Sequence, residues 1–206
     1  MMKSTRRTRE FYQRATLTVA RELLGQRLVK LEEDHTRLSG TIIEVEAYVG
    51  TEDLACHARA GRTDRNETMW GPPGHAYVYF IYGMHWMLNV VTEEEGKPAA
   101  ILIRALLPEE GIPRMMERRN SRKRTQLLNG PAKLCQAFGI NHAADGTDMC
   151  DSGGKFFIEE AGQIPENAVT TGARVGLKNV PEPWKSVSWR FQVLPGSFNR
   201  QEGFEE

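Results

Sequence analysis

The spacing of apolar residues changes several times along the first quarter of the chain. In "TLTVARELLG" (residues 16–25), Leu17, Ala20, Leu23 and Leu24 share one helical face, and Gly25 is placed to end the helix. The next apolar segments, "RLVKLEE" and "LSGTIIEVEAYVG", alternate or cluster branched residues around the polar "DHTR". This pattern predicts a short helix followed by a β-hairpin.

A second hairpin is predicted after a long polar segment. Residues 50–75 are rich in glycine and proline, and a loop of that length in a compact domain is usually functional or disordered. The segments "HAYVYFI" and "HWMLNVVT" follow as two strands joined through Tyr82-Gly83-Met84, and "PAAILIRALLP" is predicted to be a further strand.

Helices and short strands are predicted in the remainder. "EGIPRMMERR" is expected to be helical, and in "NGPAKLCQAFGI" Asn129 or Gly130 caps a helix that Pro131 begins and Gly139 ends. Between "KFFIEE" and "WRFQVLPG" the pattern alternates as in strands. The strands fall in consecutive hairpins instead of alternating with helices, which favours an α+β fold with an antiparallel sheet. We expect one domain over residues 1–206, with flexible ends at 1–15 and 198–206.

Composition and charge add few constraints. The chain has 206 residues and a formal net charge of zero, so bulk charge does not point to nucleic acid. No apolar run reaches the ~20 residues of a membrane span. Three cysteines without CxxC spacing favour a reducing cytoplasm over a disulfide framework. The basic cluster "RMMERRNSRKR" (residues 114–124) is either a solvated helix end or a binding surface.

Two glutamates and one arginine are candidates for chemistry. Glu44 and Glu46 lie two residues apart, so on a strand both carboxylates face the same side. They could simply form an exposed polar face. Arg104 lies in the apolar "AILIRALL" and needs a partner if it is buried. It either forms a structural ion pair with one glutamate or helps to hold a water that a glutamate deprotonates.

Five separated segments resemble one known family. In order, "EVEAYVGTEDLACHARAGRTDRN", "YVYFIYGMHWMLNVV", "ILIRALLP", "NGPAKLCQAFGI" and "ARVG" are similar to the motifs of the alkyladenine (3-methyladenine) DNA glycosylases of the mammalian type, which many bacteria also carry. The resemblance runs from about Leu23 to Gly196. It implies a monofunctional enzyme without cofactor or metal that flips a damaged purine out of double-stranded DNA and hydrolyses its N-glycosidic bond. The implied sheet is curved, is flanked by helices and carries a DNA-inserting hairpin.

The resemblance also implies a role for individual residues in DNA binding and base recognition. Tyr82 would fill the gap left by the extruded nucleotide, and Met84 would support it from the minor-groove side. The aromatic walls that stack on the base would be Tyr48, His57 and Tyr79.

Catalysis and discrimination would depend on a smaller set. Glu46 corresponds to the base that activates water, and Arg104 to the residue that helps to orient that water, with the main-chain carbonyl of Val175 as a further contact. Asn89 would crowd the pocket floor against the 2-amino group of guanine. Ala55 is a pocket residue in the same family pattern. Glu44 and Tyr77 receive no role from the resemblance, and Tyr77 is expected to be structural.

Departures and competing classes remain. His85 and Ala100 stand where mammalian members have tyrosine and cysteine, which can change the preference among alkylated bases, hypoxanthine and ethenoadenine. A metallohydrolase built on the histidines and Cys56 lacks a recognised ligand spacing. A non-catalytic lesion-binding module would need only the aromatic hairpin and the basic residues 118–124, and a lyase would need a lysine that the pocket motifs lack. We expect a monomeric, cytoplasmic bacterial protein.

Overall fold

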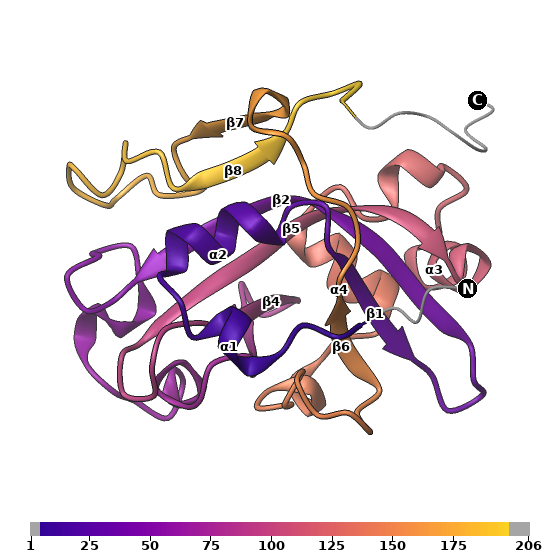
Figure 1. The fold of residues 1–206 in the computed structure, drawn as a ribbon, viewed down its shortest axis with the longest axis horizontal. Coiled ribbons are helices and arrows are strands. Elements are labelled where there is room, and N and C mark those ends of the chain that lie inside the picture. Colours follow the sequence, from indigo (N-terminus) through magenta and orange to yellow (C-terminus); the bar gives the residue numbers. More distant parts are fainter. Residues whose placement is uncertain (1–4, 198–206) are drawn as a thin grey trace.

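One long strand, β2 (Arg37–Val49), organises an eight-stranded sheet within residues 5–197, the part of the chain that the computed structural model describes (Figure 1). Along one edge, β2 pairs with β5 (Ala99–Glu110) over most of its length. Along the other edge it pairs first with β1 (Arg27–Leu31) and then with β8 (Arg190–Val193). Three strands from different parts of the sequence therefore pair with β2.

The rest of the sheet extends from this centre by antiparallel pairing. The strand order is β3 (Ala76–Ile81), β4 (His85–Val91), β5, β2, β1 and β6 (Phe156–Glu159), and β7 (Val169–Gly172) pairs with β8. All of these ladders are antiparallel. The two hairpins predicted from alternation, β1–β2 and β3–β4, are both present.

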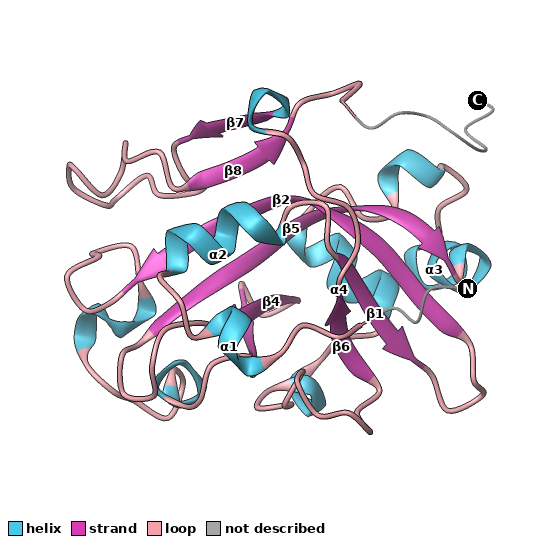
Figure 2. Cartoon of the chain, in the orientation of Figure 1, coloured by secondary structure: helices cyan, strands magenta, loops and turns pink. Residues whose placement is uncertain are grey.

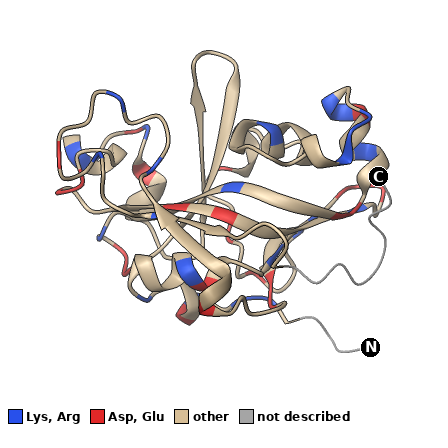
Figure 3. Ribbon diagram, turned by 90° about the horizontal axis from the view of Figure 1, so that it is seen from above, with Lys and Arg blue, Asp and Glu red and all other residues tan. Residues whose placement is uncertain are grey.

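The described part of the chain has four α-helices, which cover the sheet on its two sides (Figures 1 and 2). Within residues 5–197, α1 (Arg9–Tyr12) and α2 (Thr16–Leu23) lie on one side, and α3 (Ile112–Arg119) and α4 (Pro131–Phe138) lie on the other (Figure 3). Apolar side chains of α2 and α4 join those of the sheet in one continuous buried cluster. The predicted α+β class, with an antiparallel sheet flanked by helices, is confirmed.

The amino-terminal residues differ from the expectation of a flexible segment over 1–15. Residues 5–15 contain α1, whose Phe11 and Tyr12 are buried in the core. The Arg7 amide donates to the Ile158 carbonyl of β6, which ties the segment to the sheet edge. Burial of two aromatic rings explains why this segment is held. Residues 1–4, and the other expected flexible end at 198–206, lie outside the described residues.

The β3–β4 hairpin projects from the sheet on the side of α3 and α4 (Figure 3). At its tip Tyr82 and Gly83 have positive φ values of 55° and 66°, and the Met84 amide donates to the Ile81 carbonyl. A bulky residue in the left-handed region is uncommon and costs about 1–2 kcal/mol. The turn therefore holds Tyr82 in a conformation that favours glycine.

The long loop 50–75 is ordered around one buried asparagine. Its two 3-10 helices are His57–Ala60 and Glu67–Trp70. Between them, Asn66 accepts from the Thr63 amide and the Trp70 indole N–H, and it donates to the carbonyls of His57 and Gly61. Four hydrogen bonds from one side chain fix the shape of the loop that carries His57.

The basic cluster at residues 114–124 is largely used within the molecule. Arg114 pairs with Asp34, and Arg118 pairs with Glu32, in the turn between β1 and β2. Arg119 donates to the side chain of Gln136 on α4. The charges of α3 thus hold the end of the first hairpin instead of standing unopposed in solvent. Separately, no helix within residues 5–197 has the length and apolarity needed to cross a membrane.

A stability prediction follows from the β5–α3 junction. Gly111 has φ +73°, and a Cβ there would lie 2.8 Å from the Arg37 carbonyl oxygen and would also overlap the Leu38 side chain. Gly96 has a similar φ of +86°, with nothing within 4 Å of its Cβ position. We expect Gly96→Ala to cost about 1–2 kcal/mol from backbone strain alone. Gly111→Ala should cost about 1–3 kcal/mol more, because overpacking is added. Urea denaturation measures both, and equal losses would contradict the overlap.

Candidate active site

A bulge in β2 brings two glutamates and one arginine together. The pairing register between β2 and β5 shifts on both sides of Glu44, and bulges re-aim side chains in this way. Val45 and Ala47 enter the apolar core, while Glu44 and Glu46 both reach Arg104 on β5. The two carboxylates share one face of the strand, as the spacing predicted, but the face is not an exposed one.

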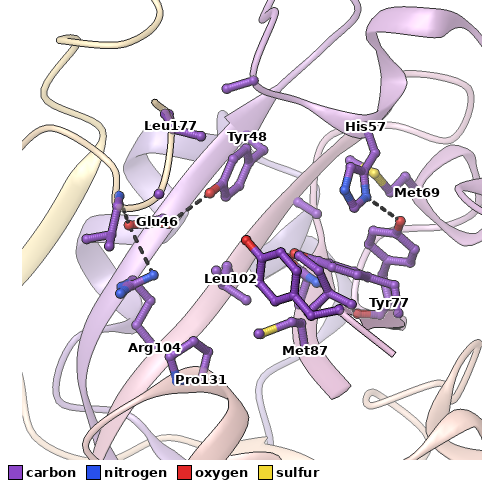
Figure 4. Close-up of a pocket in the computed structure, with 18 residues that line it drawn as sticks. Glu46, Tyr48, His57, Met69, Tyr77, Met87, Leu102, Arg104, Pro131 and Leu177 are labelled. Atoms are coloured by element: carbon purple, nitrogen blue, oxygen red, sulfur yellow. Dashed lines mark hydrogen bonds and ion pairs between the residues drawn. The ribbon is translucent and has the colours of Figure 1, made fainter. Parts of the chain in front are cut away.

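Glu46 is a fully buried carboxylate with donors on both oxygens (Figure 4). Its Oε1 accepts from the Val175 amide at 2.6 Å and lies 3.2 Å from Nη1 of Arg104. Its Oε2 accepts from the Tyr48 hydroxyl at 2.8 Å. Burial raises the pKa of Glu46 above its usual value, and Arg104, the Val175 amide and the Tyr48 hydroxyl oppose that rise. The arrangement suits a carboxylate that takes up a proton more readily than an exposed one.

Arg104 is held by the second glutamate. Its Nε donates to Glu44 Oε1 at 2.8 Å, and Arg190 on β8 lies 3.4 Å from the same oxygen. Arg104 and Glu44 are mostly buried, with 14% and 16% of their side chains exposed. The sequence assigned no role to Glu44, and the structure places it where it fixes the guanidinium that contacts Glu46.

An aromatic group faces this carboxylate from the far end of the same cavity (Figure 4). The rings of His57 and Tyr79 meet edge to face, with centroids 4.5 Å apart. Nδ1 of His57 lies 2.8 Å from the Tyr77 hydroxyl, so Tyr77 holds the imidazole from behind. Burial, together with nearby Arg65 and Arg59, lowers the pKa of His57 to about 4, so the ring is neutral near pH 7.

Asn89 also lines this cavity and is held in place by the main chain. Its side chain is buried, and Nδ2 donates to the Tyr77 main-chain carbonyl at 3.0 Å. Asn89 lies opposite Leu102 in the β4–β5 ladder and opposite Tyr77 in the β3–β4 ladder. Two ladders therefore determine where its amide stands in the cavity.

The cavity has a volume of about 330 Å³ and collects nearly all of the predicted site. Among its lining residues are Glu46, Tyr48, Ala55, His57, Tyr79, Tyr82, Asn89, Arg104 and Val175. Met84 does not line it. Met84 instead lies at the hairpin tip beside Tyr82, where 67% and 77% of their surfaces are exposed. Tyr82 thus belongs both to the exposed tip and to the rim of the cavity.

Some contacts were not foreseen from the sequence. The Val175 segment was expected to contribute its carbonyl, and the contact with Glu46 is made by its N–H. Tyr48 was expected only as a stacking wall, and its hydroxyl also donates to Glu46. The alternation of Glu46 and Tyr48 on β2 is a signal for that second contact, because residues two apart share a face. Nothing local in the sequence signals the Val175 amide.

The described residues also bear on metal-dependent chemistry and on chemistry that uses a lysine nucleophile. Between residues 5 and 197, no three histidine, cysteine or acidic side chains are grouped so that they could hold a metal ion. The candidate ligands lie apart in different contacts. The His57 ring contacts Tyr79, Nδ1 of His75 lies near the Pro72 carbonyl, and Cys56 is buried in an apolar cluster. Among the same described residues, no lysine lines the cavity. The polar groups available there are one carboxylate, one guanidinium, tyrosine hydroxyls, one imidazole and one amide.

Comparison with known proteins identifies the family. The family model of the methylpurine-DNA glycosylases (MPG) matches residues 10–196. A Chlorobaculum parvum protein named "Putative 3-methyladenine DNA glycosylase" is 45% identical over 177 residues, which cover 85% of this chain and 84% of the relative. Proteins with the same name from Methanocella arvoryzae and Desulfitobacterium hafniense are also 45% identical, covering 86% and 90% of this chain and 89% and 93% of theirs. The family model matches nearly all of the described chain, and the relatives are 45% identical over most of their length. This chain therefore belongs to the methylpurine-DNA glycosylase family.

Proposed function

We propose that this protein is a monofunctional DNA glycosylase that hydrolyses the N-glycosidic bond of a damaged purine extruded from double-stranded DNA. Family membership supports the reaction, and the observation that carries it here is the buried carboxylate of Glu46 at one end of an aromatic cavity. A base inside a duplex cannot enter such a cavity, so the nucleotide must be flipped out.

Glu46 is proposed as the general base. A water placed between Glu46 and the sugar would lose a proton to the carboxylate as it attacks C1′, and the leaving purine would take the bonding electrons. The negative charge of Glu46 would also stabilise the oxocarbenium-like sugar. Arg104 contacts Glu46 at 3.2 Å and is proposed to orient the water, with the Val175 backbone beside it.

Base recognition is proposed to combine stacking with charge. Tyr48, Tyr79 and His57 offer ring faces or edges to the base, and each stacked base gains about 1–3 kcal/mol. 3-Methyladenine and 7-methylguanine carry positive charge, which aromatic faces attract. Because its pKa is lowered to about 4, His57 adds no opposing positive charge near pH 7.

The lesion range is proposed to include 3-methyladenine, 7-methylguanine, hypoxanthine and ethenoadenine. Neutral lesions gain no cation–π term, so their selection would depend on exclusion of normal bases. Asn89 is proposed to crowd the 2-amino group of guanine, and its amide is held in place by the Tyr77 carbonyl. Ala100 lines the cavity, and Ala55 lies at its His57 end, so both help to set its width.

The hairpin tip is proposed to hold the flipped state. An inserted side chain must be flat, exposed and rigidly presented. Tyr82 is 77% exposed and is fixed by a left-handed turn, while Met84 stands beside it. The strain stored at Tyr82 is typical of functional positions. We propose that the protein acts on DNA as a monomer.

A non-catalytic lesion-binding module is the second candidate. It would need the cavity and the hairpin but would gain nothing from a buried carboxylate with three donors, because burying a charge is costly. Of the basic residues 118–124 that it would use, Arg118 is paired with Glu32 and Arg119 donates to the Gln136 side chain. A lyase is a weaker alternative, since no lysine of residues 5–197 lines the cavity to form a Schiff base.

The first prediction tests Glu46 as the general base. The substrates are duplexes that are identical except for which of the four lesions they carry. Glu46→Gln should lower excision by at least ~100-fold while lesion binding survives, because the amide cannot accept the proton. Glu44→Gln should lose far less, since its oxygen can still accept from Nε of Arg104. Single-turnover base release measures both variants. Equal losses, or full activity in Glu46→Gln, would remove Glu46 from the mechanism.

The second prediction separates the inserted residue from the pocket wall. Tyr82→Ser should weaken binding to paired hypoxanthine markedly but cost less excision in a mismatch or bulge, where extrusion is already easier. Tyr79→Ser should lose activity in either context, because it removes part of the cavity wall. Binding and excision are compared on paired and mispaired hypoxanthine. If Tyr82→Ser loses equally on both, or binds the paired lesion as wild type does, Tyr82 is not the inserted residue.

A further inference from the structure

Asp53 and Arg174 form an ion pair that is completely withdrawn from solvent beside the cavity. Neither side chain has any exposed surface. Both guanidinium Nη atoms donate to the carboxylate, Nη2 at 2.8 Å from Oδ1 and Nη1 to Oδ2. Neither residue received a role from the sequence, and neither lines the cavity.

Arg174 touches the surroundings of Glu46 in two ways. Its Cζ lies 4.7 Å from the centroid of the Tyr48 ring, whose hydroxyl donates to Glu46 Oε2. It also directly precedes Val175, whose amide donates to Glu46 Oε1. Both hydrogen-bond donors that the protein offers to Glu46, apart from Arg104, are therefore attached to or stacked on Arg174.

The remaining contacts of Arg174 join it to β2 and to the segment before β8. Nη1 donates to the Ala47 carbonyl of β2 at 2.9 Å, and Nη2 donates to the Trp184 carbonyl at 3.1 Å. The guanidinium also lies 5.1 Å from the Trp189 ring centroid. The segment that carries Val175 is thus fastened to the strand that carries Glu46.

Asp53 fastens the other wall of the cavity. Its Oδ1 accepts from the Ala55 amide at 3.0 Å, and its Oδ2 accepts from the Val49 amide at 3.3 Å. Ala55 lines the cavity, and the 3-10 helix that begins with His57 follows two residues later. One carboxylate therefore joins the end of β2, the beginning of the long loop and the segment before Val175.

The energetics of the pair do not favour a role in stability alone. Burying two charges costs several kcal/mol per ion, and apolar replacements of such pairs are often as stable. Nε of Arg174 is also buried without a hydrogen-bond partner among the described residues. What apolar side chains cannot supply is directional bonding to three separate segments at once.

We propose that Asp53 and Arg174 are positioning residues. They hold the Val175 amide and the Tyr48 hydroxyl against Glu46, and they fix the position of Ala55, which lines the cavity, relative to Glu46. They act through these neighbours and touch neither substrate nor water. The inference rests on the proposed function for its effect on excision. Its effect on Glu46 itself is independent of that function.

The test variant is Arg174→Lys, which retains the charge but loses the bidentate contact and the flat stacking surface. Asp53→Asn is the second variant and is judged by the same criteria, so a folding failure in one does not end the test. Arg37→Lys is the matched control: Arg37 also bridges strands through Glu110 and Glu159, but it lies on β2 about 30 Å from Glu46 at ~3.3 Å per residue.

Two measurements are made on the full-length protein. The first is single-turnover hypoxanthine excision, corrected for the folded fraction. The second is the Glu46 carboxyl titration by carbon-13 NMR, assigned with Glu46→Gln. For Arg174→Lys we expect excision to fall at least ~10-fold and the Glu46 pKa to rise, because the carboxylate loses a donor that stabilises its charged form. Binding to undamaged duplex should stay within about threefold, and Arg37→Lys should change neither readout.

The proposal would be overturned if folded Arg174→Lys excised hypoxanthine as fast as the wild type. An unchanged or lowered Glu46 pKa in this variant would also overturn it. The same changes in Arg37→Lys would also overturn it, since they would follow from any lost ion pair. If wild-type protein released no base, the proposed function would fail. The titration would then still decide whether the pair positions the donors on Glu46.

Discussion

The proposed mechanism depends on one buried carboxylate, that of Glu46, which must still be able to ionise. Glu46 has no exposed surface, and burial raises its pKa by disfavouring the charged form. Arg104, the Val175 amide and the Tyr48 hydroxyl oppose that tendency. A base must be ionised before it can take a proton, yet it must also be dry enough to take one readily. If Glu46 is the base, as proposed, its surroundings meet both conditions with one cation and two neutral donors.

The fold supplies two of those three donors from distant parts of the chain. Tyr48 comes from the same strand, Arg104 comes from β5 across a bulge, and Val175 comes from the segment after β7. β2 makes this possible because it pairs with β5 along one edge and with β8 along the other. The β3–β4 hairpin is attached to the same sheet through β5, so the exposed tip and the buried carboxylate are parts of one framework.

Local sequence pattern predicted much of this arrangement and failed at identifiable places. Alternation predicted both hairpins, and the two-residue spacing predicted that Glu44 and Glu46 share a face. The family resemblance predicted that Tyr48, His57 and Asn89 share one pocket, and all three line the same cavity. The pairing of Asp53 with Arg174 joins residues 121 apart, and the Val175 amide belongs to the backbone, so no local pattern signals either. The held α1 segment was missed because four residues are too few to show a helical period.

The most direct test of the account is the pH dependence of single-turnover hypoxanthine excision. In the proposed mechanism activity requires ionised Glu46, so the rate should fall as pH decreases through a pKa raised above the usual value of about 4.5. The titration of His57, with its pKa lowered to about 4, should lie below that limb. The account predicts a rate that is constant near neutrality, a decline that begins above pH 4.5, and loss of this limb in Glu46→Gln. A wild-type rate that stays flat or rises down to pH 4.5 would contradict a mechanism based on Glu46.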